Sequence, residues 1–172
     1  MKLYSTPMCI VAILLSTAFQ QALALELDRA REGTLACVGN HLLRQGGSEI
    51  SFSGYSFRNF NPNSEITIDS VTIFDANGTI LTSLVGGTFP PGFKQVLGPN
   101  QTTNFTTRDI FGDSDIRSRA AIPLQTIVKW RADKRGFALF ANVARQDRGR
   151  DRITGAIREQ RARGVIPCAA LN

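Results

Sequence analysis

The chain has few of the residues that build metal sites and catalytic dyads. Its 172 residues include one histidine, one tryptophan, two tyrosines and three cysteines. Zinc sites gather several cysteine and histidine ligands, and the sequence shows no such cluster. A serine triad needs a histidine held by a carboxylate, and no nucleophile-elbow motif accompanies His41. We therefore expect a surface or edge histidine, and we predict no metal, no cofactor and no catalytic residue.

Long apolar runs are also scarce, and the clearest one lies near the N-terminus. Residues 8–15 (MCIVAILL) follow a positive Lys2 and precede the small-residue motif Ala22-Leu23-Ala24. This order predicts a secretory signal peptide over residues 1–24. A membrane anchor is the alternative, but polar residues between 16 and 21 interrupt the run, and a span needs roughly 20 apolar residues. A lipoprotein is disfavoured because Cys9 does not lie at the end of the run.

Cleavage after Ala24 leaves 172 − 24 = 148 residues and two cysteines, Cys37 and Cys168. In an exported protein, periplasmic or extracellular, such a pair is more often a disulfide than two free thiols. Closing so long a loop removes on the order of 4–5 kcal/mol of unfolded-state entropy in the chain-entropy model. The alternative is that the two cysteines never meet, since chain ends can lie at opposite poles.

Short alternating segments separated by turn residues dominate the middle of the chain. We divide the mature sequence into a lead-in segment (25–47), a β domain (48–146) and a basic tail (147–172). Strong helical periodicity appears nowhere between residues 48 and 145. About seven regularly spaced strands predict an all-β fold, an immunoglobulin-like antiparallel β-sandwich rather than a small barrel. The tail is predicted to be irregular or to hold a short helix over residues 155–163, ended by Gly164.

Two strands change the parity of their apolar residues part-way along. Phe52 and Tyr55 belong to opposite parities, with Gly54 between them, which predicts a β-bulge at this glycine. The next strand makes the same change at residues 69–70. Successive flips of this kind favour a strongly twisted sheet.

Three turns are readable from local chemistry. The run Asp75-Ala76-Asn77-Gly78 is a strong hairpin signal, because Asn-Gly accepts the positive φ angles of tight turns. The run Pro90-Pro91-Gly92 predicts a second turn. Residues 124–131 and 137–144 both alternate strictly, and five residues join them, which predicts a third hairpin.

The formal net charge of +6 is unevenly distributed. Residues 25–130 carry 9 basic and 10 acidic side chains, whereas residues 131–172 carry 10 basic and 4 acidic ones. Arginine matches phosphate and carboxylate geometry, so the excess predicts an anion-binding patch, unless the tail is only a solvated charged arm. The predicted patch consists of Lys134, Arg135, Arg145, Arg148, Arg150 and Arg152.

Acidic residues gather near one polar segment, residues 110–122, which we predict to be a loop. Asp109, Asp113 and Asp115 could in principle supply oxygen ligands to calcium. Their spacing fits no known calcium loop, and arginines flank them. A solvated charged loop is therefore the favoured interpretation.

Four segments together resemble a known layout: residues 56–63 (SFRNFNPN), 66–78 (ITIDSVTIFDANG), 97–105 (LGPNQTTNF) and 127–130 (IVKW). The chain is similar over residues 50–145 to a family of short exported bacterial proteins classed only as a domain of unknown function. The insertion at 109–122 and the basic tail depart from that layout. The resemblance implies a β-sandwich fold and export, and it transfers no catalytic residue.

These features predict an exported, non-catalytic envelope protein that serves as a binding or interaction module. The expected partner is an envelope protein or an anionic polymer or surface, and not nucleic acid. The alternative is a hydrolytic enzyme with an unrecognised carboxylate or Ser/His site. A cleft that brings His41 beside a serine and an acid would favour the enzyme.

Overall fold

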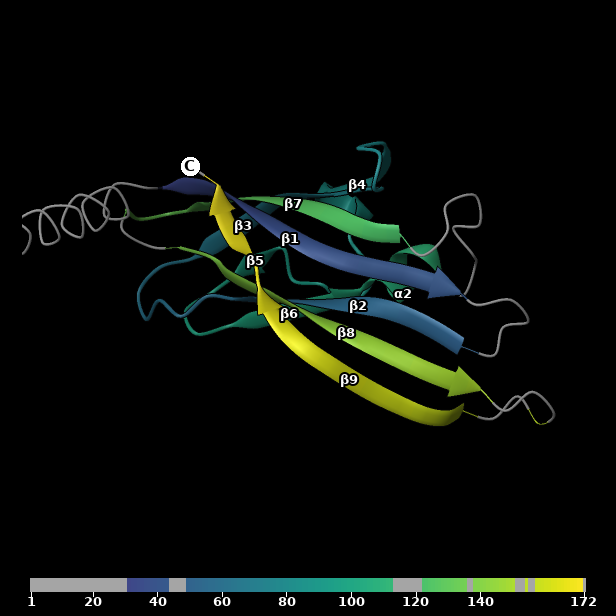
Figure 1. Ribbon diagram of the computed structural model, residues 1–172. Coiled ribbons are helices and arrows are strands. Elements are labelled where there is room, and N and C mark those ends of the chain that lie inside the picture. The colour runs from purple at the N-terminus through teal and green to yellow at the C-terminus, as the bar shows by residue number, and fades with distance from the viewer. Residues whose placement is uncertain are drawn as a thin grey trace, which may run out of the picture.

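The computed structural model describes residues 31–43, 49–112, 122–135, 138–150, 154 and 157–171. The predicted signal peptide and Arg152 lie outside these ranges, and the side chains of Arg148 and Arg150 are not described. The prediction of an all-β fold is confirmed, because ten strands make up most of the described chain (Figure 1). The strands are β1 (Glu32–Leu43), β2 (Glu49–Arg58), β3 (Ile66–Phe74), β4 (Ile80–Val85), β5 (Val96–Leu97), β6 (Thr102–Thr106), β7 (Ile122–Ala132), β8 (Phe140–Arg150), β9 (Ile157–Pro167) and β10 (Ala169–Leu171).

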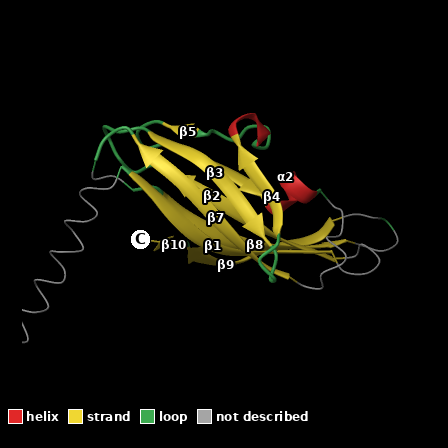
Figure 2. Cartoon of the chain, turned by 90° about the horizontal axis from the view of Figure 1, so that it is seen from above, coloured by secondary structure: helices red, strands yellow, loops and turns green. Residues whose placement is uncertain are grey.

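Helix is confined, within the described ranges, to two short segments that Figure 2 draws in red. They are the 3₁₀ turn η1 (Gly86–Thr88) and the helix α2 (Thr107–Phe111). Among the described residues, no helix is long and apolar enough to cross a bilayer. The predicted loop at 110–122 overlaps the end of α2, and most of it lies outside the described residues.

All strand pairs are antiparallel, in the order β4-β3-β7-β1-β2-β8-β9. β1 and β2 pair with each other only over three residues at one end. Beyond that point β1 pairs with β10, whereas β2 pairs with β6. The strands therefore divide into a first branch (β4, β3, β5, β7, β1, β10) and a second branch (β6, β2, β8, β9), seen above and below each other in Figure 1.

The core lies where the two branches bring their alternate side chains together. In β7, the even-numbered residues from Leu124 to Trp130 are buried, whereas the odd-numbered residues between them are exposed or half-buried. In the second branch, Tyr55 and Phe57 of β2 are fully buried. Alternation of this kind is what the period-2 geometry of a strand imposes when one face is covered.

One of the two predicted bulges is present and the other is wrong. The pairing of β3 with β7 shifts register between Ile68 and Ser70, as the parity change at residues 69–70 predicted. β2, by contrast, pairs with β8 in unbroken register through Gly54. The parity change there has another cause: Phe52 and Ser53 are both buried, so both faces of β2 are covered where the branches divide.

The Asp75 hairpin is confirmed, because it joins the antiparallel pair β3 and β4. The Asp75 carboxylate accepts hydrogen bonds from the backbone N–H groups of Asn77 and Thr79, each at 2.8 Å. Gly78 has a φ of 81°, the left-handed value that favours glycine. The turn at Pro90 is also present, since the N–H of Phe93 donates to its carbonyl at 3.1 Å.

The predicted hairpin between residues 124–131 and 137–144 is wrong. Both segments are strands, but β7 lies between β3 and β1, and β8 lies between β2 and β9. Both edges of β7 are already occupied, so β8 pairs in the other branch. Sequence proximity favours a hairpin, but β1 competes for the same edge and is paired with β7 over ten residue positions.

The prediction of a helical or irregular tail also needs correction. β9 pairs with β8 over the segment expected to be helical, and β10 pairs with β1. Gly164, expected to end a helix, has a φ of 61° and sits at a register shift between β8 and β9. Seven strands, β2 to β8, begin inside the predicted β domain, and β1, β9 and β10 come from the segments on either side of it.

Candidate binding surface

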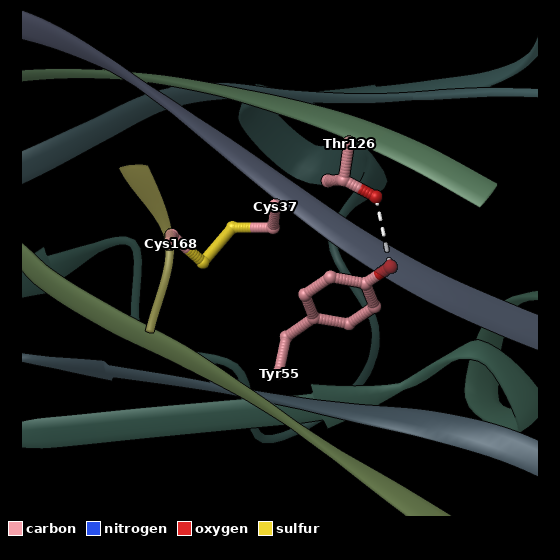
Figure 3. The surroundings of a disulfide bond; sticks show 4 residues. All are labelled: Cys37, Tyr55, Thr126 and Cys168. Carbon is pink, nitrogen blue, oxygen red and sulfur yellow. Dashed lines mark hydrogen bonds between the residues drawn. A yellow bond between two sulfur atoms is a disulfide. The ribbon is translucent and has the colours of Figure 1, made fainter. Parts of the chain in front are cut away.

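A disulfide joins Cys37 of β1 to Cys168, which lies between β9 and β10 (Figure 3). The two residues are 131 positions apart, and their Cα atoms are 4.5 Å apart. The N–H of Cys168 donates to the carbonyl of Ala141 at 2.9 Å. The disulfide therefore fastens the chain where it passes from β9, which pairs with β8 in the second branch, to β10, which pairs with β1 in the first. The predicted pairing is present, and the alternative of two cysteines that never meet is wrong.

A buried tyrosine also links the two branches. The hydroxyl of Tyr55 on β2 lies 2.8 Å from Oγ1 of Thr126 on β7, across β1 (Figure 3). The pKa of Tyr55 is raised to about 12, because the effect of burial is larger than the opposite effect of the hydrogen bond with Thr126. A Cβ atom at Gly39 of β1 would overlap the tyrosine hydroxyl, so glycine is required where the ring crosses this strand. Tyr55 is neutral at ordinary pH and serves packing.

The single histidine is buried, which corrects the expectation of a surface or edge position. His41 is 3% exposed, and its Nδ1 lies 3.1 Å from Oγ1 of Thr107. Its ring meets Phe111 edge-on with centroids 5.5 Å apart. The short helix α2 thus contributes both neighbours and covers the point where β1 and β2 pair. Sequence patterning missed this because α2 is too short to show helical periodicity.

Two buried serines lie close by, and they are the residues a Ser/His hydrolase would use. Ser53 Oγ donates to the Asn40 amide oxygen at 2.9 Å and accepts from the Asn40 N–H at 2.7 Å. Ser51 Oγ accepts from Asn40 Nδ2 at 2.5 Å and from Arg145 Nε at 3.1 Å. Hydrogen-bond donors that point at a hydroxyl oxygen engage the lone pairs that a nucleophile needs for attack. This arrangement fixes strands β1, β2 and β8 together.

The acidic residues considered for calcium do not form a site among the described residues. Both the N–H and the hydroxyl of Thr106 donate to the Asp109 carboxylate, at 2.7 and 2.9 Å, which makes a capping box for α2. Asp113 and Asp115 lie outside the described ranges. No group of three or more Asp, Glu, His or Cys side chains in the described part of the chain could hold a metal ion.

The described residues of the predicted anion-binding patch belong to two parts of the chain, the turn after β7 and the strand β8. Lys134 and Arg135 are exposed in the turn after β7, where Lys134 donates to the carbonyl of Asn63. Arg145 is exposed near the middle of β8, and Arg148 and Arg150 are at its far end. Arg152 and the side chains of Arg148 and Arg150 lie outside the described part of the chain, so the anion-binding patch stays a prediction.

A different surface emerges from the outward side chains of β6, β2 and β8. Register places Asn104, Ser56 and Asn142 in one row across the three strands. The next row contains Thr102, Arg58 and Phe140, and Phe60 follows just beyond the end of β2. We call these residues the open face: Ser56, Arg58, Phe60, Thr102, Asn104, Phe140 and Asn142.

The open face points away from the core. Its residues alternate with the buried Tyr55 and Phe57 on β2, with Thr103 and Phe105 on β6, and with Ala141 on β8. Arg58, Thr102 and Asn104 are exposed, and Ser56 and Asn142 are half-buried. Sequence reasoning missed this face because the three strands become neighbours only through the sheet topology.

Two features distinguish the open face from ordinary surface. Phe60 and Phe140 are 60% and 43% exposed, and their rings meet edge-on at 5.7 Å. Within the described part of the chain, no hydrogen bond or ion pair engages the side chains of Ser56, Arg58, Asn104 or Asn142. The face therefore combines apolar rings with polar groups that only solvent satisfies.

On the outward face of the first branch, two pairs of polar side chains interact with each other. There the hydroxyls of Thr72 and Ser83 are 3.1 Å apart and bond to each other. Arg131 lies 3.4 Å from the carboxylate of Asp69. These polar groups interact with one another across neighbouring strands.

Comparison with known proteins adds little. No family model matches the chain, and no curated protein matches it. Among solved structures, the chain resembles the crystal structure of Thermotoga maritima 1070, with 9% identity and a TM-score of 0.39. The match covers 83% of this chain and 95% of that chain. A likeness this low assigns neither fold nor function, and the resemblance to an exported family of unknown function stays a prediction.

Proposed function

We propose that this chain is an exported, non-catalytic binding module of the cell envelope, and that the open face is its binding surface. The signal-like N-terminus supports export, and the disulfide is compatible with an oxidising compartment. The observation that carries the proposal is the row of unengaged amide and hydroxyl groups beside two exposed phenylalanines. Exposed aromatic residues next to polar groups without a protein partner favour a binding surface over an ordinary solvent-exposed one.

We also propose that the two branches form an immunoglobulin-like sandwich. The antiparallel pairing throughout and the buried contact between Tyr55 and Thr126 support two layers facing each other. In such sandwiches an outward sheet face is a rigid platform, because hydrogen bonds on both edges hold the central strands. β2 has such bonds on both sides, from β6 and β8.

We propose that this chain has no hydrolytic activity. Ser51 and Ser53 accept hydrogen bonds from Asn40 and Arg145, which disfavours either of them as a nucleophile. The expected partner remains an envelope protein or an anionic polymer or surface, with no cofactor and no nucleic acid.

Sedimentation with the native envelope tests this function. The mature protein is expected to co-sediment with purified envelope, and the double variant Asn104→Ala/Asn142→Ala is expected to lose at least half of that binding. The matched control is Asn77→Ala/Gln125→Ala, which removes two exposed amides away from the open face. Equal sedimentation of both variants and the unaltered protein would remove the open face from consideration.

A further inference from the structure

We propose that the open face binds an acidic polysaccharide, with a sugar ring packed on Phe60 and Phe140 and a sugar carboxylate held by Arg58. The inference rests on the proposed function, since it names the ligand class of the same surface. Three independent properties of the face fit this class of polymer.

The first property is the aromatic pair. A pyranose ring has an apolar C–H face, and its positively polarised hydrogens suit the negative face of an aromatic ring. Phe60 and Phe140 expose 60% and 43% of their surface, so a ring placed on them removes apolar area from water. Phe140 is the first residue of β8 and lies opposite Arg58 in the pairing of β8 with β2, which holds its backbone on that side.

The second property is charge. Arg58 stands opposite both Thr102 and Phe140, in the middle of three strands. Among the described side chains of the open face it carries the one charge, and no carboxylate accompanies it. A guanidinium that is exposed and unpaired binds a planar carboxylate in a bidentate manner. A uronic acid supplies this carboxylate on the same ring that supplies the apolar face.

The third property is the amide and hydroxyl row. Asn104, Ser56 and Asn142 lie directly opposite one another across β6, β2 and β8. Residues paired in this way have Cβ atoms about 4.5–5.5 Å apart. The row offers both donors and acceptors, which the hydroxyl groups of a polysaccharide can meet in either role. A polymer crossing the face would therefore make several hydrogen bonds beside the stacked ring.

Binding to an acidic polymer and to a neutral polymer tests the inference. The probes are polygalacturonate, an acidic polymer, and dextran, a neutral one, and the measurement is affinity electrophoresis of the mature protein. Polygalacturonate is expected to retard the protein, and dextran is not. The double variant Phe60→Ala/Phe140→Ala is expected to bind about tenfold more weakly, equivalent to about 1.4 kcal/mol. Its control is Ile80→Ala, which truncates a side chain of the same 60% exposure on β4.

Arginine variants separate a carboxylate site from general attraction by a basic protein. Arg58→Gln is expected to weaken binding about tenfold, and Arg58→Lys less, because lysine keeps the charge without the planar fork. Lys129→Gln, which removes an exposed positive charge on β7 in the first branch, is expected to change binding less than twofold. Equal losses for Arg58→Gln and Lys129→Gln would overturn the inference.

The remaining outcomes are also decisive. Equal binding to dextran and polygalacturonate overturns the acidic ligand, and so does binding to neither. If the Asn104→Ala/Asn142→Ala variant nevertheless loses envelope binding, the proposed function stands and only the ligand class fails. If that variant binds the envelope normally, the proposed function itself fails. Thermal unfolding of each variant shows that the fold is retained.

Discussion

Tyr55 gives a sharp test of the packing between the branches, because its ionisation couples directly to folding. Burial raises its pKa from 10.0 to about 12 in the folded protein. An unfolded chain loses this proton near pH 10, whereas the folded chain keeps it until about pH 12. The folded state therefore binds the proton more tightly, and the stability that this supplies is lost as the pH rises.

The magnitude follows from the shift. Two pKa units at about 1.36 kcal/mol each correspond to about 2.7 kcal/mol of unfolding free energy, lost between about pH 10 and about pH 12. Replacing the tyrosine by phenylalanine removes this term. At neutral pH Tyr55→Phe is expected to cost about 1 kcal/mol, because the Thr126 hydroxyl loses its partner. The two stability curves should therefore cross, and the variant should be the more stable protein near pH 12.

The assay is urea unfolding of the mature protein and of Tyr55→Phe at a series of alkaline pH values. Lysine and arginine titration is common to both proteins, so the difference between them isolates the tyrosine. The chain has two tyrosines, and the other, Tyr4, lies in the predicted signal peptide. Tyrosinate absorbance of the mature folded protein then reports Tyr55 alone. A midpoint near pH 10 in the folded state would refute the reasoning.

Three further tests of the packing each measure the free energy of unfolding of a variant. Loss of the disulfide in Cys37→Ala/Cys168→Ala is expected to cost about 5 kcal/mol, from closure of a 131-residue loop in the chain-entropy model, and thiol reduction of the unaltered protein should match it. Gly39→Ala should cost about 1–3 kcal/mol because its Cβ would overlap the buried tyrosine hydroxyl, whereas Gly87→Ala, with no atom within 4 Å, should cost under about 0.5 kcal/mol. Asn59→Ala should cost about 2–3 kcal/mol, since its amide donates to three main-chain carbonyls at 2.7, 2.9 and 3.0 Å, and a smaller cost would show that water replaces it.

The candidate site shows how much of a binding surface the local sequence pattern can predict. Alternation predicted strands in the segments that form β2 and the first part of β8. It could not predict that Asn104, Ser56 and Asn142 stand in one row, because β6 and β8 are both distant from β2 in sequence. The buried position of His41 was unpredictable for a related reason: its cover, α2, has only five residues.

The errors also have physical causes. The strands around residues 124–131 and 137–144 were expected to pair because short loops favour hairpins. β1 instead occupies one edge of β7, and β1 belongs to a segment whose pattern was too weak to predict a strand. The tail was expected to be irregular or to hold a short helix over residues 155–163, because Gly164 is a typical helix-ending residue. An edge strand tolerates a charged, weakly apolar sequence, and β9 pairs with β8 along one side.

By itself, the sequence determined the local features: the alternating strands, the turn at Asp75, the bulge at residues 69–70 and the two cysteines available for pairing. Each depends on side-chain identity at neighbouring positions. Only the tertiary structure decided which strands are neighbours, that β1 separates β7 from β2, and that Cys168 meets Cys37. Backbone N–H and C=O groups are the same in every strand, so partner choice depends on how the whole core packs.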